Sequence, residues 1–219
     1  MLRFATIVFD LDGTIADTLQ LIYEAFDAAL RPVVGRRLSD AEIRGMFGPP
    51  DNHIIRSMVE GDDHEAAFKR YIETYEREHE RLVTAFHGVD DIMRRAAAAG
   101  VKLGVVTGKS RQTALYTLEA RGLLPVFGAV YAGDDVERQK PDPEAVIKIL
   151  DDLGHEPPSA GAFVDDSAAD VVAGRAAGLT TIAVTWGSPD HEQLFASKPD
   201  ITVHSGDELA KELGLTNSA

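Results

Sequence analysis

The segment IVFDLDGTIADT, from Ile7 to Thr18, indicates how this chain of 219 residues begins to fold. Its first residues are the β-branched and aromatic types that favour buried strands. Two carboxylates, Asp10 and Asp12, then follow one residue apart. Neighbouring anions repel each other and resist losing their hydration. We therefore predict that a buried strand ends here and that a positive group lies between the two carboxylates.

The composition indicates a globular protein with a sizeable core. Hydrophobic residues make up 44% of the chain and charged residues 26%, which is too apolar for a disordered protein. The length suits one core domain with an insertion, or two small domains. A net charge of −14 argues against a nucleic-acid surface, because binding a phosphate backbone requires a basic patch. A local cluster of cations can still bind a small anion.

Expectations about location and partners follow from what the sequence lacks. The chain has no cysteine, which excludes disulfides and thiolate chemistry. Its start, MLRFATIVFDLDG, shows no cleavage-like segment, and no apolar run in the sequence is long enough to span a bilayer. We therefore expect a cytoplasmic protein with neither nucleic acid nor membrane as a partner. The sequence leaves its oligomeric state open.

Short runs rich in valine and isoleucine alternate with helical patterns through most of the chain. The runs are TIVFD, KLGVVT, GAVYA, GAFVD and TTIAVT, beginning at Thr6, Lys102, Gly128, Gly161 and Thr180. Glycines that suit left-handed helix C-caps follow the helical segments at Gly100, Gly122, Gly154 and Gly178. Asp142 and Pro143 are expected as the N-cap and first-turn proline of another helix. This alternation predicts an α/β fold, a doubly wound parallel sheet with helices on both faces.

Between the first two strand runs the pattern is entirely helical. It consists of apolar stripes over 19–30 and 68–75, a capping box at 39–42, and a break at the FGPP stretch, 47–50. A crossover of this length exceeds what a strand–helix–strand unit requires. We predict a helical insert over 17–84, hinges at 15–17 and 83–87, and an α/β core formed by 1–16 and 85–219.

Four segments far apart in the chain carry polar side chains near the ends of predicted strands. They are DLDGT from Asp10 to Thr14, VTGKS from Val106 to Ser110, RQKPDPE from Arg138 to Glu144 and VDDSAAD from Val164 to Asp170. In open α/β sheets, ligands bind at the carboxyl edge, where such loops converge. The four segments therefore predict one shared site.

These four motifs, in this order and with a helical insert after the first strand, resemble the haloacid dehalogenase superfamily in its Asp-x-Asp-Gly-Thr phosphatase branch. The resemblance covers nearly the whole chain. It implies a Rossmann-like core and a phosphatase for a small phosphorylated metabolite, similar to phosphoglycolate phosphatases and related pyrophosphatases. By the same resemblance, Asp10 is the nucleophile that forms an aspartyl-phosphate, and Asp12 is the general acid and base. Gly13 permits the turn that faces Asp12 back over the site.

The resemblance also implies a Mg²⁺ cofactor. Asp10 and Asp166 through their carboxylates, and Asp12 through its backbone carbonyl, would hold this hard cation, which prefers oxygen ligands. Asp165 stands where the family usually has glycine, and would contact either the metal or its waters. Ser167 is the more plausible cap of the helix that follows.

Phosphate binding is implied for the remaining motif residues. Thr107 and the backbone N–H of Gly108 would bind phosphoryl oxygens, and Lys140 would neutralise charge on the phosphate and on Asp10. Asp170, one helical turn after Asp166, would orient Lys140 or a water of the metal.

Other polar residues carry less specific signals. Arg44, Arg56 and Lys109 are candidate cations for the organic part of a substrate. The seven histidines show no metal-ligand spacing, and we expect His53 and His87 at the surface or at a hinge.

Several functions remain compatible with these motifs. An inorganic pyrophosphatase or a sugar-phosphate phosphatase would share all four. A phosphoglucomutase-like isomerase is less favoured, because that group has a histidine where this chain has Ile22, and a dehalogenase lacks the second aspartate of the first motif. A non-catalytic binding protein is disfavoured because every proposed catalytic group is present.

Overall fold

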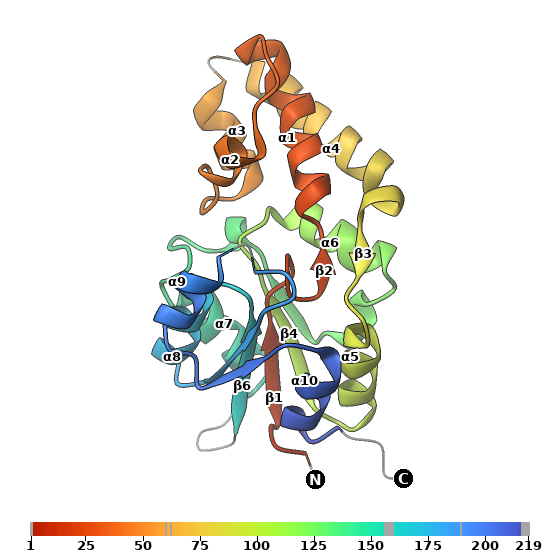
Figure 1. The fold of residues 1–219 in the computed structure, drawn as a ribbon, viewed down its shortest axis with the longest axis vertical. Helices are drawn as coiled ribbons and strands as arrows, with labels where there is room; N and C mark the ends of the chain where they lie inside the picture. The colour runs from red at the N-terminus through yellow and green to blue at the C-terminus, as the bar shows by residue number, and fades with distance from the viewer. Residues whose placement is uncertain (1, 60, 62, 156–159, 189, 216–219) are drawn as a thin grey trace.

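The structure, a computed structural model, describes residues 2–59, 61, 63–155, 160–188 and 190–215. Its centre is one sheet of six strands in the order β5-β4-β1-β6-β7-β8, with every neighbouring pair parallel (Figure 1). The strands are β1 (Thr6–Phe9), β4 (Lys102–Val106), β5 (Ala129–Tyr131), β6 (Gly161–Asp165), β7 (Thr180–Val184) and β8 (Ile201–Val203). The predicted doubly wound parallel sheet is confirmed.

Helices cover both faces of this sheet. They are α5 (Val89–Ala98), α6 (Arg111–Ala120), α7 (Glu144–Asp152), α8 (Ala168–Ala176), α9 (His191–Ala196) and α10 (Gly206–Leu213), with short 3-10 helices η1 (Leu124–Val126) and η2 (Gly133–Asp135). Side chains of β1 alternate between the faces. Ile7 and Phe9 belong to the apolar cluster of α5 and α10, whereas Val8 belongs to that of α7. The central strand is thus buried on both sides.

An insertion of four helices follows β1 and lies beyond the carboxyl end of the sheet (Figure 1). The helices are α1 (Leu19–Val34), α2 (Asp40–Arg44), α3 (Asp51–Met58) and α4 (Asp63–Leu82). They share a separate apolar core, in which Phe26 and Tyr71 pack with ring centroids 4.9 Å apart. The capping box predicted at Ser39 and Glu42 is present at the start of α2.

A two-stranded ribbon joins the insertion to the sheet domain. β2 (Ala16–Asp17) pairs antiparallel with β3 (Thr84–Ala85), so both connections run side by side next to the end of β1. The ribbon lies at the predicted ends of the insert. It was not foreseen, because two-residue strands leave no periodic pattern in the sequence.

Local helix signals in the sequence were mostly correct. The four predicted cap glycines all adopt left-handed backbone conformations, with φ between 58° and 83°. The expectation for Pro143 was wrong: it occupies the N-cap position, and α7 begins at Glu144. Asp142 still caps the helix, because its Oδ1 accepts a hydrogen bond from the Glu144 N–H at 3.0 Å. β8 was also missed, since its three residues are too few for a recognisable run.

The helices of this chain are short or polar relative to a membrane span. Within the described part of the chain, none of them combines the length and the apolar character needed to cross a membrane.

The packing of α7 against the sheet predicts a measurable difference between two isoleucines of the same helix. Ile149 is fully buried and occupies the space beside Gly104, whereas Ile147 is 53% exposed. We expect Ile149→Ala to lower the free energy of unfolding by about 3 kcal/mol, because it leaves a cavity in the core. Ile147→Ala, the matched control, should change it by less than about 0.5 kcal/mol. Urea denaturation of both variants measures this, and equal losses would contradict the assigned orientation of α7.

Candidate active site

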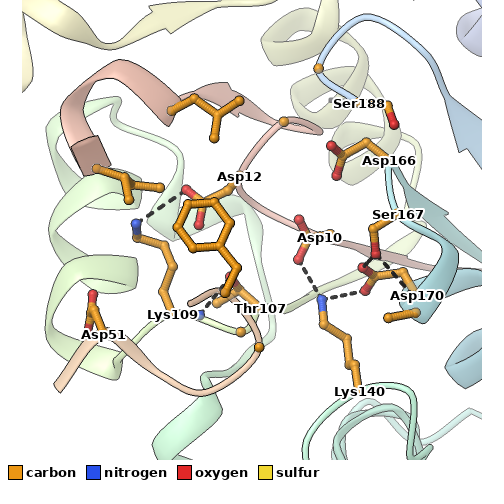
Figure 2. A pocket seen from close by; sticks show the side chains of 18 of the residues that line it. Asp10, Asp12, Asp51, Thr107, Lys109, Lys140, Asp166, Ser167, Asp170 and Ser188 are labelled. Carbon is orange, nitrogen blue, oxygen red and sulfur yellow. Dashed lines mark hydrogen bonds and ion pairs between the residues drawn. The ribbon is translucent and has the colours of Figure 1, made fainter. Parts of the chain in front are cut away.

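Two lysines and a group of aspartates face one another at the carboxyl end of β1. Lys140 Nζ donates a hydrogen bond to Asp10 Oδ1 at 2.7 Å and also forms an ion pair with Asp170 (Figure 2). Lys109 Nζ lies 3.4 Å from Asp12 Oδ1. The sequence predicted one positive group between Asp10 and Asp12. In the structure each of these aspartates also has a lysine beside it.

Burial sets the electrostatics of this cluster. Desolvation raises the pKa of Asp10 from 3.8 to about 7, although the nearby Lys140 ammonium opposes the change. Burial alone would lower the pKa of Lys140, but the carboxylates of Asp10 and Asp170 raise it above its usual value. Lys140 therefore stays protonated at neutral pH and holds a fixed positive charge against Asp10.

The aspartate pair after β6 completes the acidic cluster. Asp166 accepts a hydrogen bond from Thr14 Oγ1 at 3.3 Å, and burial together with the Asp10 carboxylate raises its pKa well above the usual value. A Cβ atom on Gly13, whose φ is 78°, would lie 2.3 Å from Asp166 Oδ2. Only glycine allows the turn after Asp12 to come this close to the second carboxylate.

Asp165 differs from Asp166 in its surroundings. It is the last residue of β6 and is completely buried, and neither carboxylate oxygen has a hydrogen-bond partner. Burial, with the Asp170 carboxylate next in importance, raises its pKa well above the usual value. Such a group is expected to be protonated at neutral pH unless a cation compensates its charge.

The donor set fits a hard divalent cation. Asp10 and Asp166 offer carboxylate oxygens. Asp12, two residues after Asp10, offers its backbone carbonyl oxygen. The surplus of buried carboxylates over lysines favours a bound positive charge. In the described ranges, no three acidic or histidine side chains are gathered at metal-binding spacing.

A cavity of about 480 Å³ opens between this cluster and the helical insertion. Most of the residues predicted for the site line it together: Asp10, Asp12, Thr107, Gly108, Lys140, Asp166 and Asp170. Thr107 directly follows β4 and is buried, and its Oγ1 accepts a hydrogen bond from the Lys109 N–H at 3.4 Å. Asp165 does not line the cavity, so it has no direct access to a bound substrate.

The structure places several further residues at the cavity or beside it. Thr18 Oγ1 donates a hydrogen bond to Asp12 Oδ1, which fixes the orientation of that carboxylate. The loop after β7 packs on the Asp12–Gly13 turn, because Trp186 Nε1 donates to the Thr14 carbonyl at 3.2 Å. Thr18 could have been suspected, since it belongs to the opening segment. The loop carries no sequence motif.

Of the three candidate substrate cations, the structure places one at the cavity and two away from it. Lys109 lines the cavity, while Arg44 and Arg56 are exposed and do not. The guanidinium of Arg44 donates instead to the hydroxyl of Tyr23, at 3.0 and 3.1 Å. Asp51, a buried carboxylate on α3 that the sequence did not single out, also lines the cavity.

The chain resembles known proteins in both sequence and fold. A family model described as haloacid dehalogenase-like hydrolase matches residues 7–184. A pyrophosphatase, PpaX, from Bacillus pumilus is 34% identical over 209 residues, covering 95% of this chain and 96% of that protein. A predicted phosphoglycolate phosphatase from Haemophilus somnus has a TM-score of 0.85 at 22% identity, covering 97% of this chain and 99% of the other. CbbY from Rhodobacter sphaeroides, solved in complex with phosphate, has a TM-score of 0.82 at 23% identity, covering 97% and 100%.

The raised pKa of Asp10 predicts a pH-dependent stability in the absence of metal. Between pH 3.8 and about 7 the folded protein retains a proton on Asp10 that the unfolded chain releases, so this residue lowers the free energy of unfolding as the pH rises. Asp10→Asn cannot ionise. We therefore expect its melting temperature, measured in EDTA, to rise relative to the wild type between pH 4 and pH 7.

The control for this comparison is Asp17→Asn, which removes an exposed carboxylate from the same segment. It shows whether removing any carboxylate from this segment gives the same change with pH. A melting-temperature difference for Asp10→Asn that stays constant with pH would show that folding leaves the Asp10 carboxyl unperturbed.

Proposed function

The chain belongs to the haloacid dehalogenase-like hydrolases, and from this membership we propose that it is a Mg²⁺-dependent phosphatase of a small phosphorylated metabolite, with Asp10 as nucleophile. One observation carries the proposal: the buried Asp10 carboxylate lines the cavity and is held by Lys140 at 2.7 Å. A buried carboxylate fixed in this way is positioned for covalent catalysis. We further propose that residues 17–84 form a cap over a core made of 1–16 and 85–219.

In the proposed reaction a carboxylate oxygen of Asp10 attacks phosphorus, and the bond from phosphorus to the leaving oxygen breaks. Asp12 gives its proton to that oxygen. Asp12 then takes a proton from water, which attacks the aspartyl-phosphate, releases phosphate and restores Asp10. Lys140, held by Asp170, keeps its positive charge beside the reacting oxygens throughout.

Other residues would support these steps. Thr18 and Lys109 hold the Asp12 carboxylate beside the cavity, where it would give a proton to the leaving oxygen and take one from the attacking water. Thr107 and Gly108, which line the cavity, would bind phosphoryl oxygens. A Mg²⁺ ion held by Asp10, Asp166 and the Asp12 carbonyl would neutralise the charge of the transferring phosphoryl group.

The bond that is cleaved is either an ester or an anhydride. Monoester hydrolysis is our first candidate. An inorganic pyrophosphatase is the second, and the name of the Bacillus pumilus relative supports it. The cytoplasmic location expected from the sequence remains a prediction.

The cap is docked on the core in this structure. Thr113 of α6 donates its hydroxyl to Asp51 of α3 at 2.8 Å, and Tyr75 of α4 shares a hydrogen bond of 2.8 Å with Thr117. Two further hydrogen bonds join α4 to α6, from the Tyr116 hydroxyl to the Glu76 carbonyl and between His79 and Thr117. Both connections of the chain run through the short ribbon. We propose that the cap opens at this ribbon to admit substrate and closes to exclude water during phosphoryl transfer.

The assignment of the nucleophile predicts the effect of one isosteric change. Asp10→Asn should lower kcat for phosphate release by at least about 10³-fold, because an amide is a poor nucleophile. Asp40→Asn, which changes an exposed aspartate at the start of α2, should keep kcat within about twofold. Phosphate release from p-nitrophenyl phosphate with Mg²⁺ measures both. Substantial turnover by Asp10→Asn would remove Asp10 from its role.

The proposed cofactor is tested by removing and replacing it. EDTA should abolish phosphate release, and excess Mg²⁺ should restore it. Ca²⁺ should not restore activity, because its larger and less regular ligand shell displaces the Asp10 carboxylate relative to phosphorus. An activity that persists in EDTA would contradict the proposed metal requirement.

A further inference from the structure

The part of the cavity under the insertion is walled by apolar side chains. Those from the cap include Leu19, Ile22, Phe26, Phe47, Ile54 and Tyr71. Ile22, Phe26 and Ile54 are buried, so the apolar walls are already shielded from solvent when the cap is docked on the core. Phosphate binding belongs to the opposite part, where Asp10 and Lys140 meet. The apolar part is therefore where the leaving group of a substrate would lie.

Positive charge in this leaving-group region is already balanced. Among the described residues that line the cavity, Lys109 and Lys140 are the only cations, and Lys140 is held by Asp10 and Asp170. Lys109 Nζ lies 3.4 Å from Asp12 and 4.7 Å from the centre of the Tyr75 ring. Once Asp12 is protonated as the proposed general acid, the compensation of Lys109 depends on the Asp51 carboxylate, whose charge raises the pKa of Lys109.

Asp51 adds a fixed negative charge to the same region (Figure 2). It begins α3 and is only 5% exposed. Its Oδ2 accepts a hydrogen bond from Thr113 Oγ1 at 2.8 Å, and its Oδ1 accepts one from the Asn52 N–H at 2.9 Å. These two bonds hold the carboxylate at the cavity wall. Burial has the largest influence on both neighbouring groups, raising the pKa of Tyr71 and lowering that of Lys109, and the Asp51 charge raises the pKa of each.

We infer that the natural leaving group is an uncharged, largely apolar alcohol, and that Asp51 makes the site select against anionic leaving groups. This inference rests on the proposed phosphatase function. A carboxylate or a second phosphate placed here would lose its hydration against apolar walls, next to a like charge and without a free partner. An uncharged alcohol loses no such hydration, and its apolar part is removed from water.

The overall reaction balances for such a substrate. The phosphoryl group moves from the ester oxygen to Asp10 and then to water, the ester oxygen takes the proton of Asp12, and Asp12 recovers a proton from the attacking water. The products are the free alcohol and inorganic phosphate. Phosphoglycolate and pyrophosphate would follow the same steps, so selection against them occurs in binding and in the positioning of the leaving group.

Competition between two compounds of equal shape tests the inference. Isobutyl phosphate has the skeleton of phosphoglycolate, with two methyl groups in place of the carboxylate oxygens. Each competes with p-nitrophenyl phosphate in the presence of Mg²⁺, and pyrophosphate serves as a third competitor. We expect the inhibition constant of isobutyl phosphate to be at least about 10-fold lower than those of both anionic compounds.

The substitution Asp51→Asn should then leave the positive charge of Lys109 less compensated. We expect it to lower the inhibition constant of phosphoglycolate by about 10-fold while that of isobutyl phosphate changes less than about threefold. Asp40→Asn is the matched control, because Asp40 also begins a cap helix but is exposed. It should change neither constant.

The outcomes separate the inference from the function on which it rests. The wild-type comparison needs no variant, so it stands even if Asp51→Asn folds poorly. Turnover of p-nitrophenyl phosphate with equal or tighter binding of phosphoglycolate or pyrophosphate overturns the inference alone. If the ratio of the inhibition constants of phosphoglycolate and isobutyl phosphate is unchanged in a folded Asp51→Asn variant, Asp51 does not have the proposed role. Absence of any turnover overturns the proposed function and the inference with it.

Discussion

The ion pair of Lys140 with Asp10 and Asp170 joins three distant parts of the chain at the end of the central strand. Asp10 leaves β1, Asp170 lies in the first turn of α8, and Lys140 comes from the loop before α7. Burying several carboxylates together is costly unless positive charge compensates them. One protonated lysine reaches two of them, and the remaining imbalance is what favours a divalent cation at Asp10 and Asp166.

The sheet order explains why these groups meet. β1 lies between β4 and β6, so the residues that follow the three strands, Asp10, Thr107 and Asp166, share one edge. Glycine then allows the loops above them to approach closely. A Cβ on Gly187 would lie 2.0 Å from the carbonyl oxygen of Gly13, which leaves no room for any side chain there. Backbone packing thus fixes the Asp12 turn at the wall of the cavity.

The sequence predicted the sheet and the gathering of motif residues, because both follow from local patterns. Buried parallel strands are continuous apolar runs, and their carboxyl ends lie at the same edge of the sheet for any loop conformation. Elements without a local pattern were missed, as with the two-residue strands of the ribbon. Asp51 could not be foreseen, since its position over Lys109 results from how the cap docks on α6. For the same reason Arg44 and Arg56, plausible as substrate ligands from their charge alone, lie outside the cavity.

Chemical trapping of the proposed covalent intermediate is the most direct test of the role given to Asp10. The Mg²⁺-loaded protein would be mixed with p-nitrophenyl phosphate, quenched in acid during turnover, digested and sequenced by mass spectrometry. We predict an acid-stable, hydroxylamine-labile phosphoryl group on Asp10, because acyl phosphates survive brief acid treatment and react with hydroxylamine. A phosphoryl group on another residue of an active enzyme would contradict this account.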